Sequence, residues 1–166
     1  MRTGLPASLA ANYDHVAVAT RRIRDVLPLY ADLLGGTFYW GGDNARTGFR
    51  ALQLALANGS RIEILEPLPG STFLDRFLER TGGGGLHHVT CKVPDIRAAI
   101  AAAEQAGYTP VSPFLDNPEW QEVFLHPKET GGVLIQLVQA PPSGQAEGSI
   151  ERVLAGHGRN GTGVPS

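Results

Sequence analysis

The feature that most constrains this 166-residue chain is an internal repeat. The stretch "DHVAVATRRI" resembles "HHVTCKVPDI" further along the chain, and "SRIEILEP" resembles "GVLIQLVQ" in the same order. His15 and His88 are 73 positions apart, and so are Glu63 and Gln136. Because two separate stretches agree on one shift, the sequence predicts two copies of a single structural unit.

Each copy has the pattern of a βαβββ unit. An alternating stretch leads into a helical segment, "RDVLPLYADLLGG" or "PDIRAAIAAAEQAGY", which ends near glycine, and Pro28 interrupts or kinks the first of these. Further alternating stretches, "FRALQLAL" and "QEVFLHP", precede the last strand of each copy. The sequence therefore predicts an α+β fold of two tandem βαβββ modules, at residues 13–70 and 86–140.

The remaining segments are expected to connect or flank the modules. A short helix and a glycine hinge should link them at residues 71–85, after an N-terminal extension at 1–12. Residues 141–166 are rich in Pro, Gly and Ser, and we expect a flexible C-terminal tail there.

Composition narrows the class of partner. A net charge of -2 and a pI near 6.2 give no basic surface of the kind that binds nucleic acid. No apolar run is long enough to span a bilayer, and the single cysteine, Cys91, excludes an intramolecular disulfide. We therefore expect a cytoplasmic homodimer that binds a small molecule and neither nucleic acid nor membrane.

The adjacent histidines His87 and His88 cannot share one role, since neighbouring residues of a strand point to opposite faces. The valine-rich faces of the two equivalent strands should pack beneath the helices. His15 and His88 then lie on the opposite, concave face. His87 is left at the strand entrance, where a structural hydrogen bond is the expected role.

The second pair of equivalent strands adds two more polar side chains to that face. Glu63 lies mid-strand between isoleucines, where a carboxylate is costly unless it is solvated or paired with a cation. Two imidazoles, one carboxylate and one amide oxygen suit a divalent first-row metal such as Co, Zn, Ni, Mn or Fe. The sequence thus predicts one metal ion per chain, bound by His15, Glu63, His88 and Gln136.

The motifs "DHVAVAT", "RIEILEPL", "GLHHVTCKVPDIRAAI" and "FLHPKETGGVLIQLVQ" resemble the vicinal oxygen chelate superfamily over Tyr13 to Gln139. This group contains glyoxalase I, bleomycin resistance proteins, extradiol dioxygenases and methylmalonyl-CoA epimerases, and the chain is most similar to the epimerase branch. The resemblance implies paired modules that form a U-shaped cleft around one metal. In such enzymes the metal stabilises an enolate formed by proton abstraction.

The chain departs from the epimerase pattern at both catalytic acids. Where the epimerases carry glutamate at the position of Gln136, this chain has an amide, which cannot accept a proton as a carboxylate does. The other acid of the pattern matches "NARTGFR", on Arg46. Glu119 and Glu122 in "NPEWQEVF" are the remaining candidates for a catalytic base.

Three residues are candidates for substrate binding. The guanidinium of Arg46 suggests an anionic group on the substrate. Trp40 and Trp120 lie near the third-strand entrances of the two halves, where they could line a substrate pocket or equally pack in the core.

The leading functional hypothesis is a metal-dependent isomerase, epimerase or lyase that acts on an enolisable carbonyl or acyl substrate. A non-haem iron(II) dioxygenase is an alternative, because His15, His88 and Glu63 form a set of two histidines and one carboxylate. A third alternative is a non-catalytic protein that binds or sequesters a small molecule and needs no metal.

Overall fold

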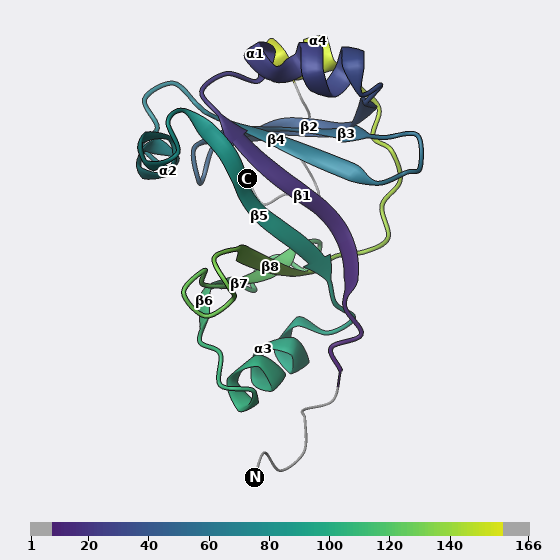
Figure 1. The fold of residues 1–166 in the computed structure, drawn as a ribbon. Helices are drawn as coiled ribbons and strands as arrows, with labels where there is room; N and C mark the ends of the chain where they lie inside the picture. The colour runs from purple at the N-terminus through teal and green to yellow at the C-terminus, as the bar shows by residue number, and fades with distance from the viewer. Residues whose placement is uncertain (1–7, 158–166) are drawn as a thin grey trace. The chain divides into compact units, whose positions relative to one another are not determined.

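The structure is a computed structural model that describes residues 8–157 (Figure 1). Part of the expected N-terminal extension and the last residues of the expected tail lie outside this range. Along the chain the elements are β1 (Asn12–Thr20), α1 (Ile23–Leu27), η1 (Pro28–Leu33), β2 (Thr37–Asn44), β3 (Phe49–Ala55), β4 (Arg61–Pro67), α2 (Asp75–Arg80), β5 (Gly84–Lys92), α3 (Ile96–Gln105), β6 (Pro110–Phe114), β7 (Gln121–Leu125), β8 (Leu134–Gln139) and α4 (Ile150–Leu154).

Both halves have the predicted βαβββ topology. In the first half the strand order is β2-β3-β4-β1, with β1 parallel to β4 and the other neighbours antiparallel. In the second half the order is β5-β8-β7-β6, with β5 parallel to β8 and the other neighbours antiparallel. The prediction of an α+β fold built from two such modules is confirmed. No helix in the described range is long and apolar enough to cross a membrane.

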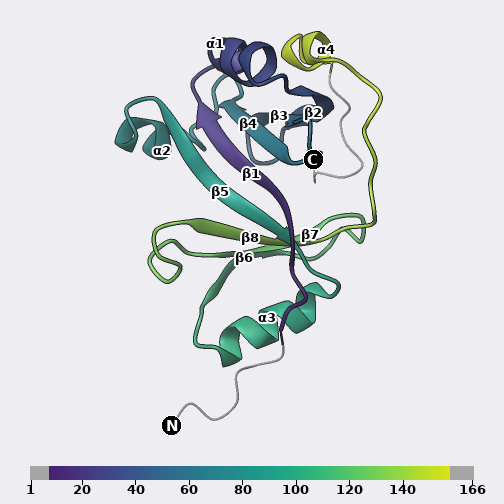
Figure 2. The ribbon, with the colours of Figure 1, turned by 45° about the vertical axis from the view of Figure 1, so that its right-hand side comes forward.

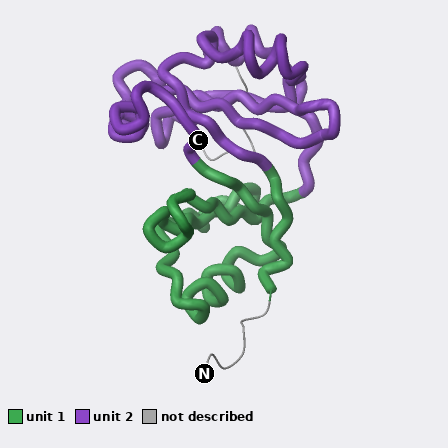
Figure 3. Tube along the Cα trace, viewed as in Figure 1, with its two compact units in different colours: residues 1–14, 88–141 green, residues 15–87, 142–166 purple. Residues whose placement is uncertain are grey.

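The chain divides into two compact units, coloured separately in Figure 3. One unit comprises residues 1–14 and 88–141, and the other comprises residues 15–87 and 142–166. The start of β1 therefore belongs with the second half of the sequence, and the segment after residue 141 belongs with the first.

The repeat extends to the hydrogen bonds at the helix starts. The backbone N–H of Ile23 donates to the Glu66 carboxylate at 2.7 Å, and that of Ile96 donates to the Gln139 amide oxygen at 2.8 Å. Both pairs are related by the same shift of 73 positions. Each module thus holds the start of its first helix with a polar side chain from its last strand, which satisfies a donor that the helix itself leaves unpaired.

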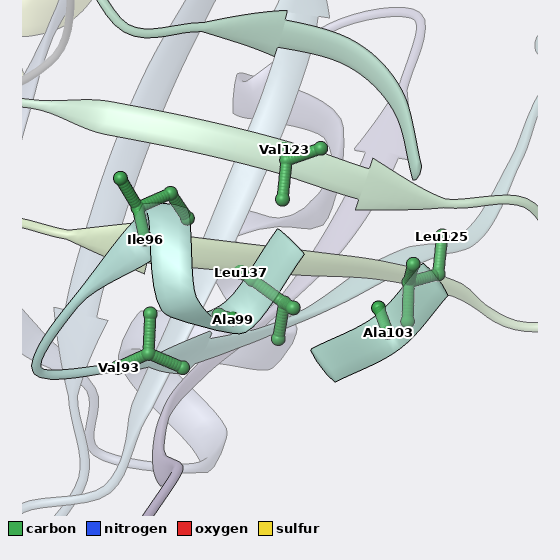
Figure 4. Packing of buried hydrophobic residues seen from close by; sticks show 7 residues of the cluster. All are labelled: Val93, Ile96, Ala99, Ala103, Val123, Leu125 and Leu137. Atoms are coloured by element: carbon green, nitrogen blue, oxygen red, sulfur yellow. The ribbon is translucent and has the colours of Figure 1, made fainter. Parts of the chain in front are cut away.

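In the unit of residues 88–141, α3 covers one face of the strands. Figure 4 shows how the apolar side chains of the strands and the helix meet to form this core. Asp95 caps the helix by accepting hydrogen bonds from the backbone N–H groups of Arg97 and Ala98, both at 2.9 Å. The buried members of this cluster are Val93, Ile96, Ala99, Ala103, Val123, Leu125 and Leu137.

The first helix is short because of Pro28, as the sequence predicts. Proline lacks an N–H and its ring clashes with the carbonyl four residues earlier, so regular α-helical bonding cannot continue through it. The chain instead enters a π-helical turn, in which the N–H of Leu34 donates to the carbonyl of Leu29 at 2.9 Å.

The segment expected to be a flexible tail contains α4, which lies beside α1 in Figures 1 and 2. Val153 is 1% exposed and packs with the apolar side chains under α1. Strand β2 admits this contact because Gly41 lacks a side chain: a Cβ there would lie 2.6 Å from a Val153 methyl group. Before α4, the N–H of Ala146 donates to the Tyr39 carbonyl at 2.8 Å. The apolar residues of α4 therefore pack as a helix against the first module, although the segment around them is rich in Pro, Gly and Ser.

Replacing Val153 with aspartate should destabilise the protein by about 3 kcal/mol or more, because an unpaired carboxylate would be buried among apolar side chains. Urea unfolding followed by circular dichroism measures this. Arg152→Asp, on the exposed side of the same helix, is the matched control and should change stability by less than about 1 kcal/mol. Equal unfolding midpoints for the two variants would show that α4 is not part of the folded core.

Candidate metal centre

His15 and Glu63 meet on one face of the first module. In the parallel register Ala17 of β1 lies opposite Glu63 of β4, so the neighbouring imidazole of His15 reaches the carboxylate. His15 Nε2 lies 3.5 Å from Glu63 Oε2, and both side chains are buried. Two donors each roughly 2.1 Å from one tetrahedral ion would be about 3.4 Å apart, so this spacing suits a shared metal.

The Glu63 carboxylate has a second partner that the sequence analysis did not identify. Gln53 lies directly opposite Glu63 in the antiparallel β3–β4 register, and its Nε2 donates to Glu63 Oε1 at 3.1 Å. Both residues are buried. A polar amide in the middle of the apolar stretch "FRALQLAL" was the available signal, but its partner depends on strand register.

His88 completes a three-residue cluster. His15, Glu63 and His88 each offer one ligand atom, and these atoms all lie within 4.8 Å of one another. All three side chains are buried, and within the described range this is the group of histidine and acidic residues with metal-ligand spacing. Two imidazoles and a carboxylate are appropriate donors for a divalent first-row metal.

His87 has a different environment from its neighbour. Its ring contacts the edge of Phe77 from α2, with 4.9 Å between ring centroids. Burial lowers the pKa of His87, and Arg80 acts in the same direction while Glu63 opposes both. His87 therefore packs against α2, its burial favours the neutral imidazole, and it is not a member of the three-residue cluster.

Gln136 lies in a chain of hydrogen bonds on its own module. The hydroxyl of Thr90 donates to Gln136 Oε1 at 2.6 Å, and Gln136 Nε2 donates to Glu122 Oε2, also at 2.6 Å. The indole N–H of Trp120 donates to the same Glu122 oxygen at 2.9 Å. The sequence indicates Gln136, Glu122 and Trp120 as separate candidates, whereas their contacts and the part of Thr90 are visible only in the structure.

The other predicted site residues lie outside the three-residue cluster and outside the hydrogen-bond chain of Gln136. Glu119 is exposed in the turn before β7, where its backbone N–H donates to the side chain of Asn117. Arg46 is exposed in the turn between β2 and β3. Trp40 is half-buried and packs against the apolar cluster that contains Ala17, so in this structure it serves the core.

Known proteins resemble this chain in sequence and fold. Residues 14–124 match the family described as Glyoxalase/Bleomycin resistance protein/Dioxygenase superfamily. The mitochondrial methylmalonyl-CoA epimerase of Dictyostelium discoideum is 30% identical over 126 residues, which cover 75% of this chain and 75% of that protein. The ethylmalonyl-CoA/methylmalonyl-CoA epimerase of Cereibacter sphaeroides is 31% identical over 129 residues, covering 76% of this chain and 96% of that protein. The crystal structure of methylmalonyl-CoA epimerase from Mycobacterium tuberculosis has a TM-score of 0.68 at 28% identity, covering 86% of this chain and 93% of that one.

Replacing Gln53 with leucine in chelator-treated protein should lower the free energy of unfolding by about 1–3 kcal/mol, because the buried Glu63 carboxylate loses a donor. The double variant Gln53→Leu/Glu63→Leu should recover most of the loss, since neither polar group then remains buried. Urea unfolding measures both, with the exposed Gln105→Leu as control. A Gln53→Leu protein as stable as that control would contradict the assigned contact.

Proposed function

We infer the function of this chain from its family, because it belongs to the Glyoxalase/Bleomycin resistance protein/Dioxygenase superfamily, in the methylmalonyl-CoA epimerase-like branch. It is an enzyme of the isomerase class. We propose that it is a metal-dependent epimerase that moves the proton on the α-carbon of a malonyl-type acyl-CoA thioester. The observation that carries the proposal is the buried cluster of His15, Glu63 and His88.

The donor set supports the metal part of the proposal. When bound, a divalent ion would supply the positive charge that stabilises enolate oxygens. His15, Glu63 and His88 would hold it, and Gln53 orients the Glu63 carboxylate by its hydrogen bond. We assign Gln136 as a weaker fourth ligand, since an amide oxygen that accepts one bond from Thr90 keeps a second lone pair.

Among the acids proposed as base, we favour Glu122 over Glu119. Glu122 lies on β7, where the alternate residues Val123 and Leu125 face α3, and its carboxylate contacts Gln136 on the other face. Glu119 is exposed in a turn, where its backbone N–H donates to the side chain of Asn117. A base must reach the reacting proton from a fixed position, so the strand residue is the better candidate.

We keep Arg46 as the proposed contact for an anionic part of the substrate, because a guanidinium on an exposed turn suits carboxylate or phosphate groups. A coenzyme A thioester supplies both. In this assignment Trp120 acts through Glu122. Its indole N–H donates to the Glu122 carboxylate, so this group is not directed at the substrate.

An iron(II) dioxygenase is a second candidate, favoured by the clustering of two histidines with one carboxylate. Oxygen consumption by the iron-loaded protein with catechol substrates would separate it from an epimerase. A lyase would begin with the same proton abstraction, and loss of a leaving group from the substrate would identify it.

We expect one cobalt(II) ion per chain in protein loaded with this metal and measured by elemental analysis. His15→Ala and His88→Ala should each abolish stoichiometric binding, since each removes an imidazole ligand, while His87→Ala should retain it. At 100 times the dissociation constant, cobalt should stabilise the wild-type fold by about 2.7 kcal/mol. Loss of binding in His87→Ala alone would overturn the ligand assignment.

Cobalt-loaded protein should exchange the α-proton of methylmalonyl-CoA for deuterium in D2O, followed by NMR. Glu122→Gln should slow exchange by about 100-fold or more, because the amide cannot accept the proton. Glu119→Gln is the matched control and should stay near the wild-type rate. Because Gln136 and Arg46 supply no second base, exchange should outpace inversion of configuration.

Equal rates of exchange and inversion would contradict the single-base path. Exchange that survives in Glu122→Gln would remove Glu122 as the base.

A further inference from the structure

Thr90 belongs to the hydrogen-bond chain that leads to Glu122. It is 0% exposed on β5, two residues after His88, and its register partner on β8 is Gln136. Its hydroxyl donates to Gln136 Oε1, and Gln136 Nε2 donates to Glu122 Oε2. The three side chains thus link the strand that carries a candidate metal ligand to the strand that carries the candidate base.

The fold does not require a hydroxyl at this position. The residue 73 positions earlier, Ala17, occupies the equivalent place on β1 and is also fully buried. There the acid Glu63 is held from the other side, by Gln53 of β3. The hydroxyl of Thr90 therefore does more than fill space in the strand, since it bonds to Gln136.

The Thr90 hydroxyl fixes the orientation of the Gln136 side-chain amide. A glutamine side chain has an acceptor end and a donor end. Because the Thr90 hydroxyl donates to Oε1, Nε2 is directed at Glu122, and the opposite orientation would set an amide oxygen against a carboxylate oxygen. Two donors, from Gln136 and Trp120, then converge on Glu122 Oε2 and fix the position of the carboxylate.

We propose that Thr90 is a positioning residue for proton transfer, acting through Gln136 on the carboxylate of Glu122. This inference rests on the proposed function, in which Glu122 accepts the α-proton. It predicts that the hydroxyl, and not the volume of the side chain, determines the turnover number.

The test uses Thr90→Val, which keeps the shape and removes the hydroxyl, and Thr90→Ser, which keeps the hydroxyl. In cobalt-loaded protein, Thr90→Val should lower kcat for deuterium exchange into methylmalonyl-CoA by about three- to tenfold, the value of one hydrogen bond. KM should change by less than about twofold, because substrate contacts are intact. Thr90→Ser should restore kcat.

A second readout is independent of activity. The side-chain amide signals of Gln136 in a ¹⁵N–¹H NMR spectrum, assigned by their absence in Gln136→Glu, should shift in Thr90→Val and return in Thr90→Ser. The matched control is Thr20→Val, a buried strand threonine whose hydroxyl lies 3.4 Å from the Arg22 carbonyl and whose repeat counterpart is Val93. If Thr90→Val does not fold, Thr90→Ala replaces it, since the repeat carries alanine there.

Unmoved Gln136 amide signals in the variant, or a kcat equal to that of Thr20→Val, would overturn the positioning role while leaving the proposed function standing. A wild-type protein that catalyses no exchange would instead remove the proposed function, and the positioning role with it.

Discussion

The candidate metal centre is built around one buried carboxylate, that of Glu63. It is 7% exposed on β4, and an ionised carboxylate in such a place is very costly unless cationic or hydrogen-bonding groups surround it. The parallel pairing of β1 with β4 brings the imidazole of His15 to it, and the antiparallel pairing of β3 with β4 brings the amide of Gln53. A divalent cation bound at this point would add a positive charge beside the buried carboxylate.

The repeat duplicates the framework and varies the chemistry placed on it. Both modules hold their first helix through a side chain of the last strand, Glu66 in one and Gln139 in the other. At the equivalent position on the last strand, the first half carries Glu63 and the second half carries Gln136. In the second half Gln136 donates directly to Glu122, the acid that we propose as the base.

How much the sequence predicts depends on the kind of interaction. The shift of 73 positions was enough to predict both modules and the clustering of His15, Glu63 and His88, because equivalent positions and strand alternation are encoded locally. Gln53 and Thr90 were missed because their contacts follow from the register between strands distant in sequence. Helix α4 was missed because a five-residue helix forms only when it packs, here through Val153 on the first module.

We propose that the buried Glu63 carboxylate is part of a metal centre. Anomalous diffraction at the cobalt edge, from crystals of the cobalt-loaded protein, tests it most directly. We expect one strong peak per chain, with atoms of His15, Glu63 and His88 about 2.0–2.2 Å away. A peak bound elsewhere, or a fully ordered cluster with no peak, would contradict it.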